Sequence, residues 1–432
     1  MRENVLCAFM ATLGCATMAW LGLYGFGWND YDNEARPAFD ALVHGHLLDF
    51  LRLAPGYGGS LVERAPFALI PGLWGGGELS VYRLVALPCL LAAAAFAVWL
   101  LASMRAQNRS TLARAVALGI CVANPLTLRA LELGHPEELL GACLCVAAVV
   151  LAGRDRPLWA GLALGLAFAN KEWALLAAGP VLLALPAGHR LRCVLGAGGV
   201  AAAILAPLTL VSSGGFTAGA RGLASSPGMI FQPWQVWWFL GHHGALVHGL
   251  FGAPKPGYRA GPAWVGSVSH PLVILAGLVL TVALWWQLVR ALGRSSRLPE
   301  RDALLALALL LLLRCVLDSW DAIYYPLPFV FALLAWETQG SVRSGAPRDL
   351  PVLALSSTAL VWINFQWLPD HQFSPDAQAA FFLAWSLAFV TGLGVRLYAG
   401  DRTSIGRRRY GLPSGDRQEM TVSSLPSRLR IS

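Results

Sequence analysis

The chain has 432 residues, of which 56% are hydrophobic and 13% are charged, and its mean hydropathy is +0.57. This composition excludes an ordinary soluble globular protein, in which about a quarter of the residues are charged. The net charge of +8 does not indicate a nucleic-acid partner, because the arginines form short clusters between apolar runs, where they act as membrane topology signals.

Apolar runs of about 20 residues recur along nearly the whole chain, which is typical of helices that cross a membrane. Because backbone groups in lipid must hydrogen-bond within their own segment, we expect an all-α polytopic transmembrane bundle of about twelve spans. With both termini in the cytoplasm, most basic clusters fall inside and most acidic loops outside. The expected spans cover 5–26, 80–104, 112–130, 137–153, 157–170, 172–187, 193–213, 268–289, 302–319, 322–338, 350–367 and 377–398.

We expect one transmembrane domain over residues 1–399, with outer loops at 28–79 and 214–266. The first loop alternates acids with leucines around Asp40 in a pattern that predicts interfacial helices lying along the membrane. The tail at 400–432 is basic and polar and is predicted to be disordered in the cytoplasm. The eight cysteines lie in or at the ends of predicted spans, so no disulfide framework is expected.

An acidic cluster follows the first apolar run. The stretch WNDYDNE, Trp28–Glu34, places Asp30, Asp32 and Glu34 next to the membrane. A charge costs roughly 2.5–3.5 kcal/mol at the centre of a span and much less at its end, so these acids are tolerated close to lipid. Their position suits a base that acts on a lipid-linked substrate. The alternative for Asp32 is a surface acid or a helix cap.

Other polar groups are predicted to lie on the same outer side. They include Arg36, Arg64, Glu132, His135, Glu137, Glu138, Lys171, Glu172, Asp318 and Asp321. The spacing of Asp318 and Asp321 places both on one face if their helix continues that far. The convergence favours a reaction centre at the outer leaflet. The alternative is that acids collect outside simply because membrane topology permits it.

Three cations, Lys171, Arg64 and Arg36, are placed where they can meet an anionic lipid headgroup. Guanidinium groups can hold phosphate through two hydrogen bonds. The alternative for Lys171 is an interfacial side chain paired with Glu172. His135 could bind a sugar or phosphate, or it could cap a helix.

The second outer loop carries aromatic and histidine residues. Trp237 lies in the stretch FQPWQVWWFL and could stack on a sugar, although an aromatic belt at the membrane surface explains it equally well. His242 begins the stretch HHGALVH, whose spacing matches no recognised metal site. We therefore expect no metal and no cofactor, with a divalent metal left as an open alternative. The sequence has no Walker loop or dinucleotide-binding motif.

Three stretches together resemble the membrane-embedded type-C (GT-C) glycosyltransferase superfamily, and more narrowly the bacterial polyprenyl-phosphate-mannose-dependent mannosyltransferases. They are Asp32–Gly45 with Arg64–Phe67, Gly134–Lys171, and Asp318–Pro326. The second is the most specific, because a Gly-His turn, a span, a short basic-Pro turn, another span and a lysine follow in that order. Two positions depart from the pattern: Glu172 stands where a proline usually follows the lysine, and Ala322 where a histidine is usual.

The resemblance implies an inverting transfer of a hexose, with mannose expected, from a polyprenyl-phosphate sugar to a glycan or glycolipid acceptor. The reaction would take place on the outer face of a bacterial inner membrane, with a carboxylate as general base and cations at the leaving phosphate. For the base we favour Asp32, then Asp30, then Glu34. For the donor phosphate we favour Lys171 and Arg64, with Arg36 behind them. The candidate substrate contacts are His135, Glu137, Asp318, Trp320, Asp321, Trp237 and His242.

Two other classes of function stay open. A transporter or flippase of a lipid-linked substrate usually has ionisable groups near the membrane midplane and broken helices. Here the charges gather at the ends of clean spans, which favours the enzyme. A non-catalytic assembly protein with a GT-C-like fold is the third reading, because the two departures touch the expected substrate face.

Overall fold

The computed structural model describes residues 30–211, 231–243, 247–248, 254–293, 296–339 and 350–398. The predicted first span at 5–26, the start of the first loop at 28–29, parts of the second loop and the tail at 400–432 lie outside the described residues. The described chain is almost entirely helical, with one short antiparallel pair formed by β1 (Val247–His248) and β2 (Pro254–Lys255). The predicted all-α fold is confirmed.

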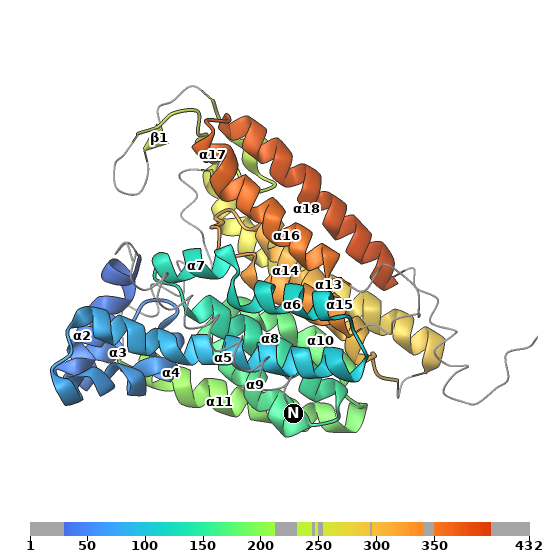
Figure 1. Ribbon diagram of the computed structural model, residues 1–432, viewed down its shortest axis with the longest axis horizontal. Helices are drawn as coiled ribbons and strands as arrows, with labels where there is room; N and C mark the ends of the chain where they lie inside the picture. The colour runs from blue at the N-terminus through green and yellow to red at the C-terminus, as the bar shows by residue number, and fades with distance from the viewer. Residues whose placement is uncertain are drawn as a thin grey trace, which may run out of the picture.

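The segment predicted as the first outer loop folds into short helices at one side of the molecule (Figure 1). Tyr31, Phe39 and Phe50 are buried and form a row of aromatic contacts with ring centroids 6.4 and 6.2 Å apart. Leu48 on the opposite side is exposed. These helices have the amphipathic character that the sequence predicts, and their contact with a membrane surface stays a prediction. They are η1 (Tyr31–Ala35), α2 (Arg36–Val43), α3 (Leu47–Leu53), α4 (Gly58–Ala68) and η2 (Ile70–Trp74).

Six helical segments in the described chain are long and apolar enough to cross a membrane. Each coincides with a predicted span, which confirms a polytopic membrane protein. The segments are α5 (Glu78–Ala106), α6 and α7 (Thr111–Val122, Pro125–Glu132), η4 and α11 (Ala187–His189, Arg190–Val211), α13 (Ala263–Leu292), α16, η6 and α17 (Val352–Trp362, Ile363–Trp367, Leu368–Asp370), and α18 (Pro375–Tyr398).

The other predicted spans within the described residues form shorter helices. The 14 residues of α9 extend for about 21 Å at 1.5 Å per residue, which is less than the ~30 Å hydrocarbon core of a bilayer. At least one end of such a helix therefore lies below the level reached by the long helices. The short helices are α8 (Glu137–Gly153), α9 (Pro157–Asn170), η3 and α10 (Glu172–Ala177, Ala178–Ala184), α14 (Glu300–Leu317) and α15 (Leu327–Thr338).

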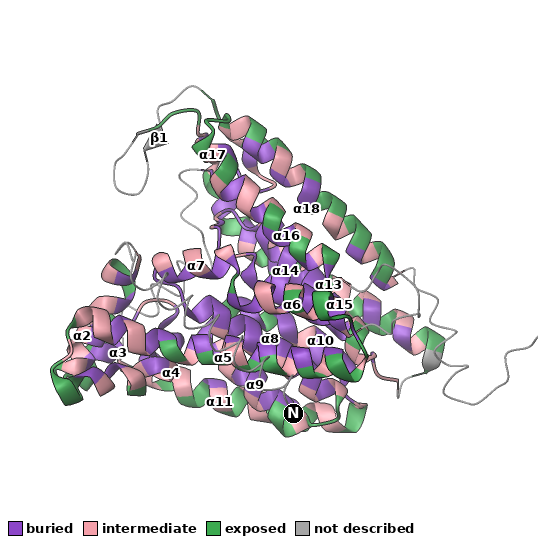
Figure 2. Cartoon of the chain, in the orientation of Figure 1, coloured by how far each residue is buried: buried purple, intermediate pink, exposed green. Residues whose placement is uncertain are grey.

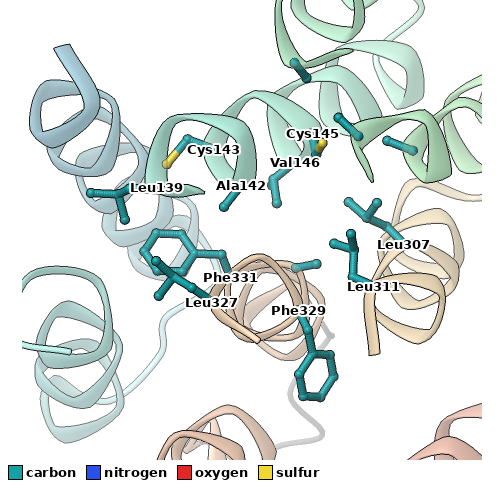
Figure 3. Close-up of a cluster of buried hydrophobic side chains, with 14 of the residues drawn as sticks. Leu139, Ala142, Cys143, Cys145, Val146, Leu307, Leu311, Leu327, Phe329 and Phe331 are labelled. Carbon is teal, nitrogen blue, oxygen red and sulfur yellow. The ribbon is translucent and has the colours of Figure 1, made fainter. Parts of the chain in front are cut away.

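The short helices α8, α14 and α15 form the centre of the bundle, where burial is highest (Figure 2). Leu139 and Val146 of α8, Leu311 of α14, and Leu327 and Phe331 of α15 are buried in this core (Figure 3). The long helices around it expose many leucine, valine and tryptophan side chains, as helices facing lipid do.

The bundle has two polar ends. In Figure 1, α5, α9 and α11 run along one edge of a wedge, and α16 and α18 run along the other. One end gathers the start of α8, the end of α9 and the end of α14. The other carries the arginine-rich connections at 154–156 and 190–192, which the positive-inside rule predicts to be cytoplasmic.

Candidate active site

A glycine turn sets the position of the first site residue. Gly134, between α7 and α8, has a φ of +88°, and a Cβ there would lie 2.7 Å from the Cβ of Tyr31. Glycine alone adopts this conformation and allows this contact without strain. The turn brings His135 against the acidic start of the described chain, where its Nε2 lies 3.1 Å from Asp30 Oδ2.

Glu137, the first residue of α8, lies at the centre of a set of ion pairs. Its Oε1 is 2.8 Å from His135 Nδ1 and 3.3 Å from Lys171 Nζ. Its Oε2 is 3.3 Å from Arg64 Nη2. All four residues are buried. Because moving an ion out of water costs several kcal/mol, these charges are tolerated only through mutual pairing.

Glu138 extends the ion pairs to a second helix. Its Oε1 lies 3.6 Å from Lys171 Nζ and accepts a 3.4 Å hydrogen bond from Trp173 Nε1, and its Oε2 lies 3.9 Å from Arg314 Nη1. The Arg314 guanidinium also stacks over the Tyr325 ring at 4.4 Å. We call this set the buried ion network; its members are Asp30, Arg64, His135, Glu137, Glu138, Lys171 and Arg314.

His135 is protonated in this setting. Burial alone would lower the pKa of His135, but the Glu137 carboxylate and the hydrogen bond to Asp30 raise it to about 9. At neutral pH both ring nitrogens therefore donate hydrogen bonds, one to Glu137 and one to Asp30. His135 holds Asp30 in a defined position.

The three acids of the first loop point in different directions. Asp30 contacts the network through His135, and its side chain is 36% exposed. Glu34 accepts a 2.5 Å hydrogen bond from the Tyr57 hydroxyl. Asp32 instead pairs with Arg36 at 3.0 Å, on the half-exposed surface of the loop. The structure thus joins Asp30 to the network and directs Asp32, the first choice from the sequence, to a surface pair.

The three candidate phosphate-binding cations also differ in whether they belong to the network. Lys171 is buried, and burial alone would lower its pKa, but Glu137 and Glu138 raise it. Its Nζ lies 4.0 Å from the Tyr57 ring centroid, while Glu172 is exposed. The alternative of a surface pair with Glu172 therefore does not describe Lys171. Arg64 joins the network, whereas Arg36 binds Asp32, Asp40 and Glu78 outside it.

The loop that follows α14 closes one side of the network. Helix α14 ends at Leu317, so Asp318 and Asp321 lie in the loop and the condition for a shared helical face, a helix that continues through Asp321, is not met. Asp318 pairs with His270 at 3.0 Å and accepts a 3.0 Å hydrogen bond from the backbone of Trp320, which is half-buried.

Within the same loop, burial raises the pKa of Asp321 well above its ordinary value, and the Asp318 carboxylate raises it further. The Tyr324 ring packs against His135 in a tilted arrangement with centroids 4.6 Å apart, which connects the loop to the network.

Trp237 and His242 lie in the segment predicted as the second outer loop. The Trp237 indole donates a 2.7 Å hydrogen bond to the Leu317 carbonyl, so it packs at the end of α14. His242 is exposed and pairs through its backbone with Ala260. The described residues contain no group of three or more His, Cys, Asp or Glu side chains arranged to hold a metal ion. The absence of a metal requirement stays a prediction.

Sequence reasoning missed several contributors to the site. Tyr57, Trp173, His270 and Arg314 were not among the predicted site residues, and Glu138 was placed on the outer side without a role. Arg314 had a recognisable signal, because a charge near the end of an otherwise apolar span marks a functional or paired position. The aromatic residues carried no such signal, since buried aromatics are ordinary in a membrane bundle.

Comparison with known families identifies the class of protein. A comparison with curated proteins found no relative that matches the chain. The sequence model of glycosyltransferase family 87 matches residues 59–315, which is more than half of the 432 residues. The matched region includes Arg64, Glu137, Lys171 and Arg314 of the buried ion network. The chain belongs to glycosyltransferase family 87, a family of membrane glycosyltransferases of the GT-C type.

Proposed function

We propose that this membrane glycosyltransferase moves a hexose, with mannose as the expected sugar, from a polyprenyl-phosphate donor to a hydroxyl of a glycan or glycolipid acceptor. The transfer takes place on the outer face of a bacterial inner membrane and inverts the anomeric carbon. The observation that carries the proposal is a half-exposed carboxylate, Asp30, at the edge of a buried network that contains Lys171 and Arg64.

Asp30 is the carboxylate best placed to act as general base. It combines partial exposure with a hydrogen bond to His135, so an acceptor hydroxyl can approach an oriented carboxylate. Asp32 is engaged by Arg36, and Glu34 by Tyr57. We therefore place Asp30 ahead of Asp32 and Glu34 in this role.

The cations of the network support a phosphate-linked donor. Four cationic groups, Arg64, His135, Lys171 and Arg314, face three carboxylates, which gives the network a net charge of +1 when His135 is protonated. Lys171 and Arg64 would bind the donor phosphate by exchanging part of their contact with Glu137 for the phosphate oxygens. Cations held in place before the reaction stabilise the charge that develops on the leaving group.

The proposed step balances in atoms and charge. The acceptor oxygen attacks the anomeric carbon from the side opposite the phosphate, and its proton passes to Asp30. The bond between the anomeric carbon and the phosphate oxygen breaks, and the electron pair leaves with the polyprenyl phosphate beside Lys171 and Arg64. The short helices α8 and α9 suit this arrangement, since a helix that ends below its longer neighbours can place charged groups at the depth of a lipid headgroup.

The test is a transfer assay on the purified protein with a panel of polyprenyl-phosphate sugars and membrane glycolipid acceptors. We expect transfer from one of these donors, with loss of transfer in Asp30→Asn and retention in the matched control Asp32→Asn. Transport of a lipid-linked sugar across proteoliposomes without transfer would instead support the transporter reading. Equal activity of Asp30→Asn and wild type would remove Asp30 as the base.

A further inference from the structure

A groove lies at the end of the bundle opposite the buried ion network. It has a volume of about 610 Å³ and is formed where α9 begins and where α11 passes beside it. Helix α9 connects the two features. Pro157, its first residue, borders the groove, and Lys171, which follows its last residue, belongs to the network. The groove residues that matter here are Asp155, Arg156, Leu158, Trp159, Arg192 and Leu195.

The groove has fixed walls. A Cβ on Gly161 would lie 2.4 Å from the Cys193 carbonyl oxygen, and a Cβ on Gly165 would lie 2.5 Å from the Ala197 carbonyl oxygen. The backbones of α9 and α11 therefore touch over more than one turn, as small residues allow between membrane helices. This contact holds the two helix ends that line the groove at a constant separation.

The lining combines cations with exposed apolar side chains. Leu158, Trp159 and Leu195 are 54%, 61% and 65% exposed, and Arg156 and Arg192 are also exposed. Apolar side chains at this level meet acyl chains, while arginine and tryptophan at helix ends lie at the height of lipid headgroups.

The groove carries more positive than negative charge. Asp155 also lines it, and its carboxylate lies 2.7 Å from Nδ1 of His189. Because Arg156 and Arg192 outnumber this one carboxylate, an anion in the groove would meet a net positive charge above an apolar floor. Arginine can hold a phosphate through paired hydrogen bonds.

We propose that this groove binds the headgroup of an anionic phospholipid of the inner leaflet, with the phosphate between Arg156 and Arg192 and an acyl chain along Leu158 and Leu195. The apolar wall favours a lipid over a free phosphate, since a free phosphate would leave that wall unused. The site is separate from the transfer reaction and does not depend on the proposed donor.

Native mass spectrometry of the full-length protein in detergent tests the site, with added phosphatidylglycerol, phosphatidylcholine or glycerol phosphate. Each cation beside an anionic lipid strengthens binding about fivefold, so Arg156→Gln and Arg192→Gln should each weaken phosphatidylglycerol binding about fivefold and together about 30-fold. The matched control is Arg290→Gln, an exposed arginine stacked on Trp286 in the last turn of α13, outside the groove. It should leave binding unchanged.

Three results would overturn the proposal. Equal weakening by Arg290→Gln would indicate attraction to surface charge in general. Equal binding of phosphatidylcholine would show that the arginines do not select an anion, and equal binding of glycerol phosphate would show that the apolar wall contributes nothing. As a second readout, phosphatidylglycerol should raise the thermal midpoint of the wild type and of Arg290→Gln but not of the double groove variant, since a ligand stabilises only a protein that binds it.

Discussion

Glu137 is the position where the structure makes its sharpest stability prediction. The substitution Glu137→Gln keeps the shape of the side chain and removes its charge. In the folded protein the Glu137 carboxylate faces His135, Lys171 and Arg64 at 2.8 to 3.3 Å, with all four residues buried. The variant should therefore leave a buried cation without its counter-charge.

The size of the stability loss depends on how each of the three cations responds to losing the Glu137 charge. Lys171 keeps Glu138 at 3.6 Å. His135 can lose its proton, since Glu137 is a main reason that its pKa is raised. Arg64 can do neither, because a guanidinium stays charged in proteins. One uncompensated buried charge costs about 3–5 kcal/mol, so we expect the free energy of unfolding to fall by about that amount, rather than by three times as much.

The assay is thermal unfolding of wild type and variant in one detergent at pH 7. At about 2 °C per kcal/mol for a large chain, the midpoint should fall by about 6–10 °C. The matched control is Glu172→Gln, an exposed acid next to Lys171 in the sequence, which should change stability by at most about 0.5 kcal/mol. Combining Glu137→Gln with Arg64→Met should recover part of the loss. A midpoint for Glu137→Gln equal to that of Glu172→Gln would refute the reasoning.

Four further predictions test other parts of the site. The pKa of His135 is raised from 6.5 to about 9 in the folded protein, so its contribution to stability is complete below pH 6.5 and is lost as pH rises towards 9. His135→Gln should therefore remove on the order of 3 kcal/mol of this pH dependence, measured as the free energy of unfolding between pH 6 and 10. Asp30→Asn should reduce the transfer rate about 100-fold or more, with Asp32→Asn close to wild type in the same assay, and a reversed order would reject Asp30 as base. Lys171→Ala should raise KM for the donor more than KM for the acceptor, and equal rises would argue against phosphate binding. Gly134→Ala should lower the free energy of unfolding by about 1–3 kcal/mol because φ is +88° there, whereas unchanged stability would show that the turn relaxes.

The outline of the site could be predicted from sequence. Arg64, His135, Glu137 and Lys171 were expected on one side of the membrane, and the structure brings all four within one set of ion pairs. The reason is that the ends of apolar spans can be located in the sequence, and a charged residue next to such an end lies at the corresponding end of the helix. The depth of the site was not predictable, because it depends on how the short helices α8 and α9 are placed against the long ones.

The partner of each charge was decided by tertiary structure. Asp30 and Asp32 are two residues apart and look equivalent in the sequence, yet only Asp30 meets His135, which lies 105 residues further along the chain. Lys171 was expected beside Glu172 or a ligand, and it faces Glu137 and Glu138 instead.

The sequence by itself determined that this is a helical membrane protein, where its helices lie and at which ends its charges gather, because twenty apolar residues in a row have one stable arrangement in a bilayer. The tertiary structure decided which carboxylate meets which cation. That choice depends on how each helix is rotated about its axis and on which helices are neighbours, and both are settled by packing between segments that are distant in the chain.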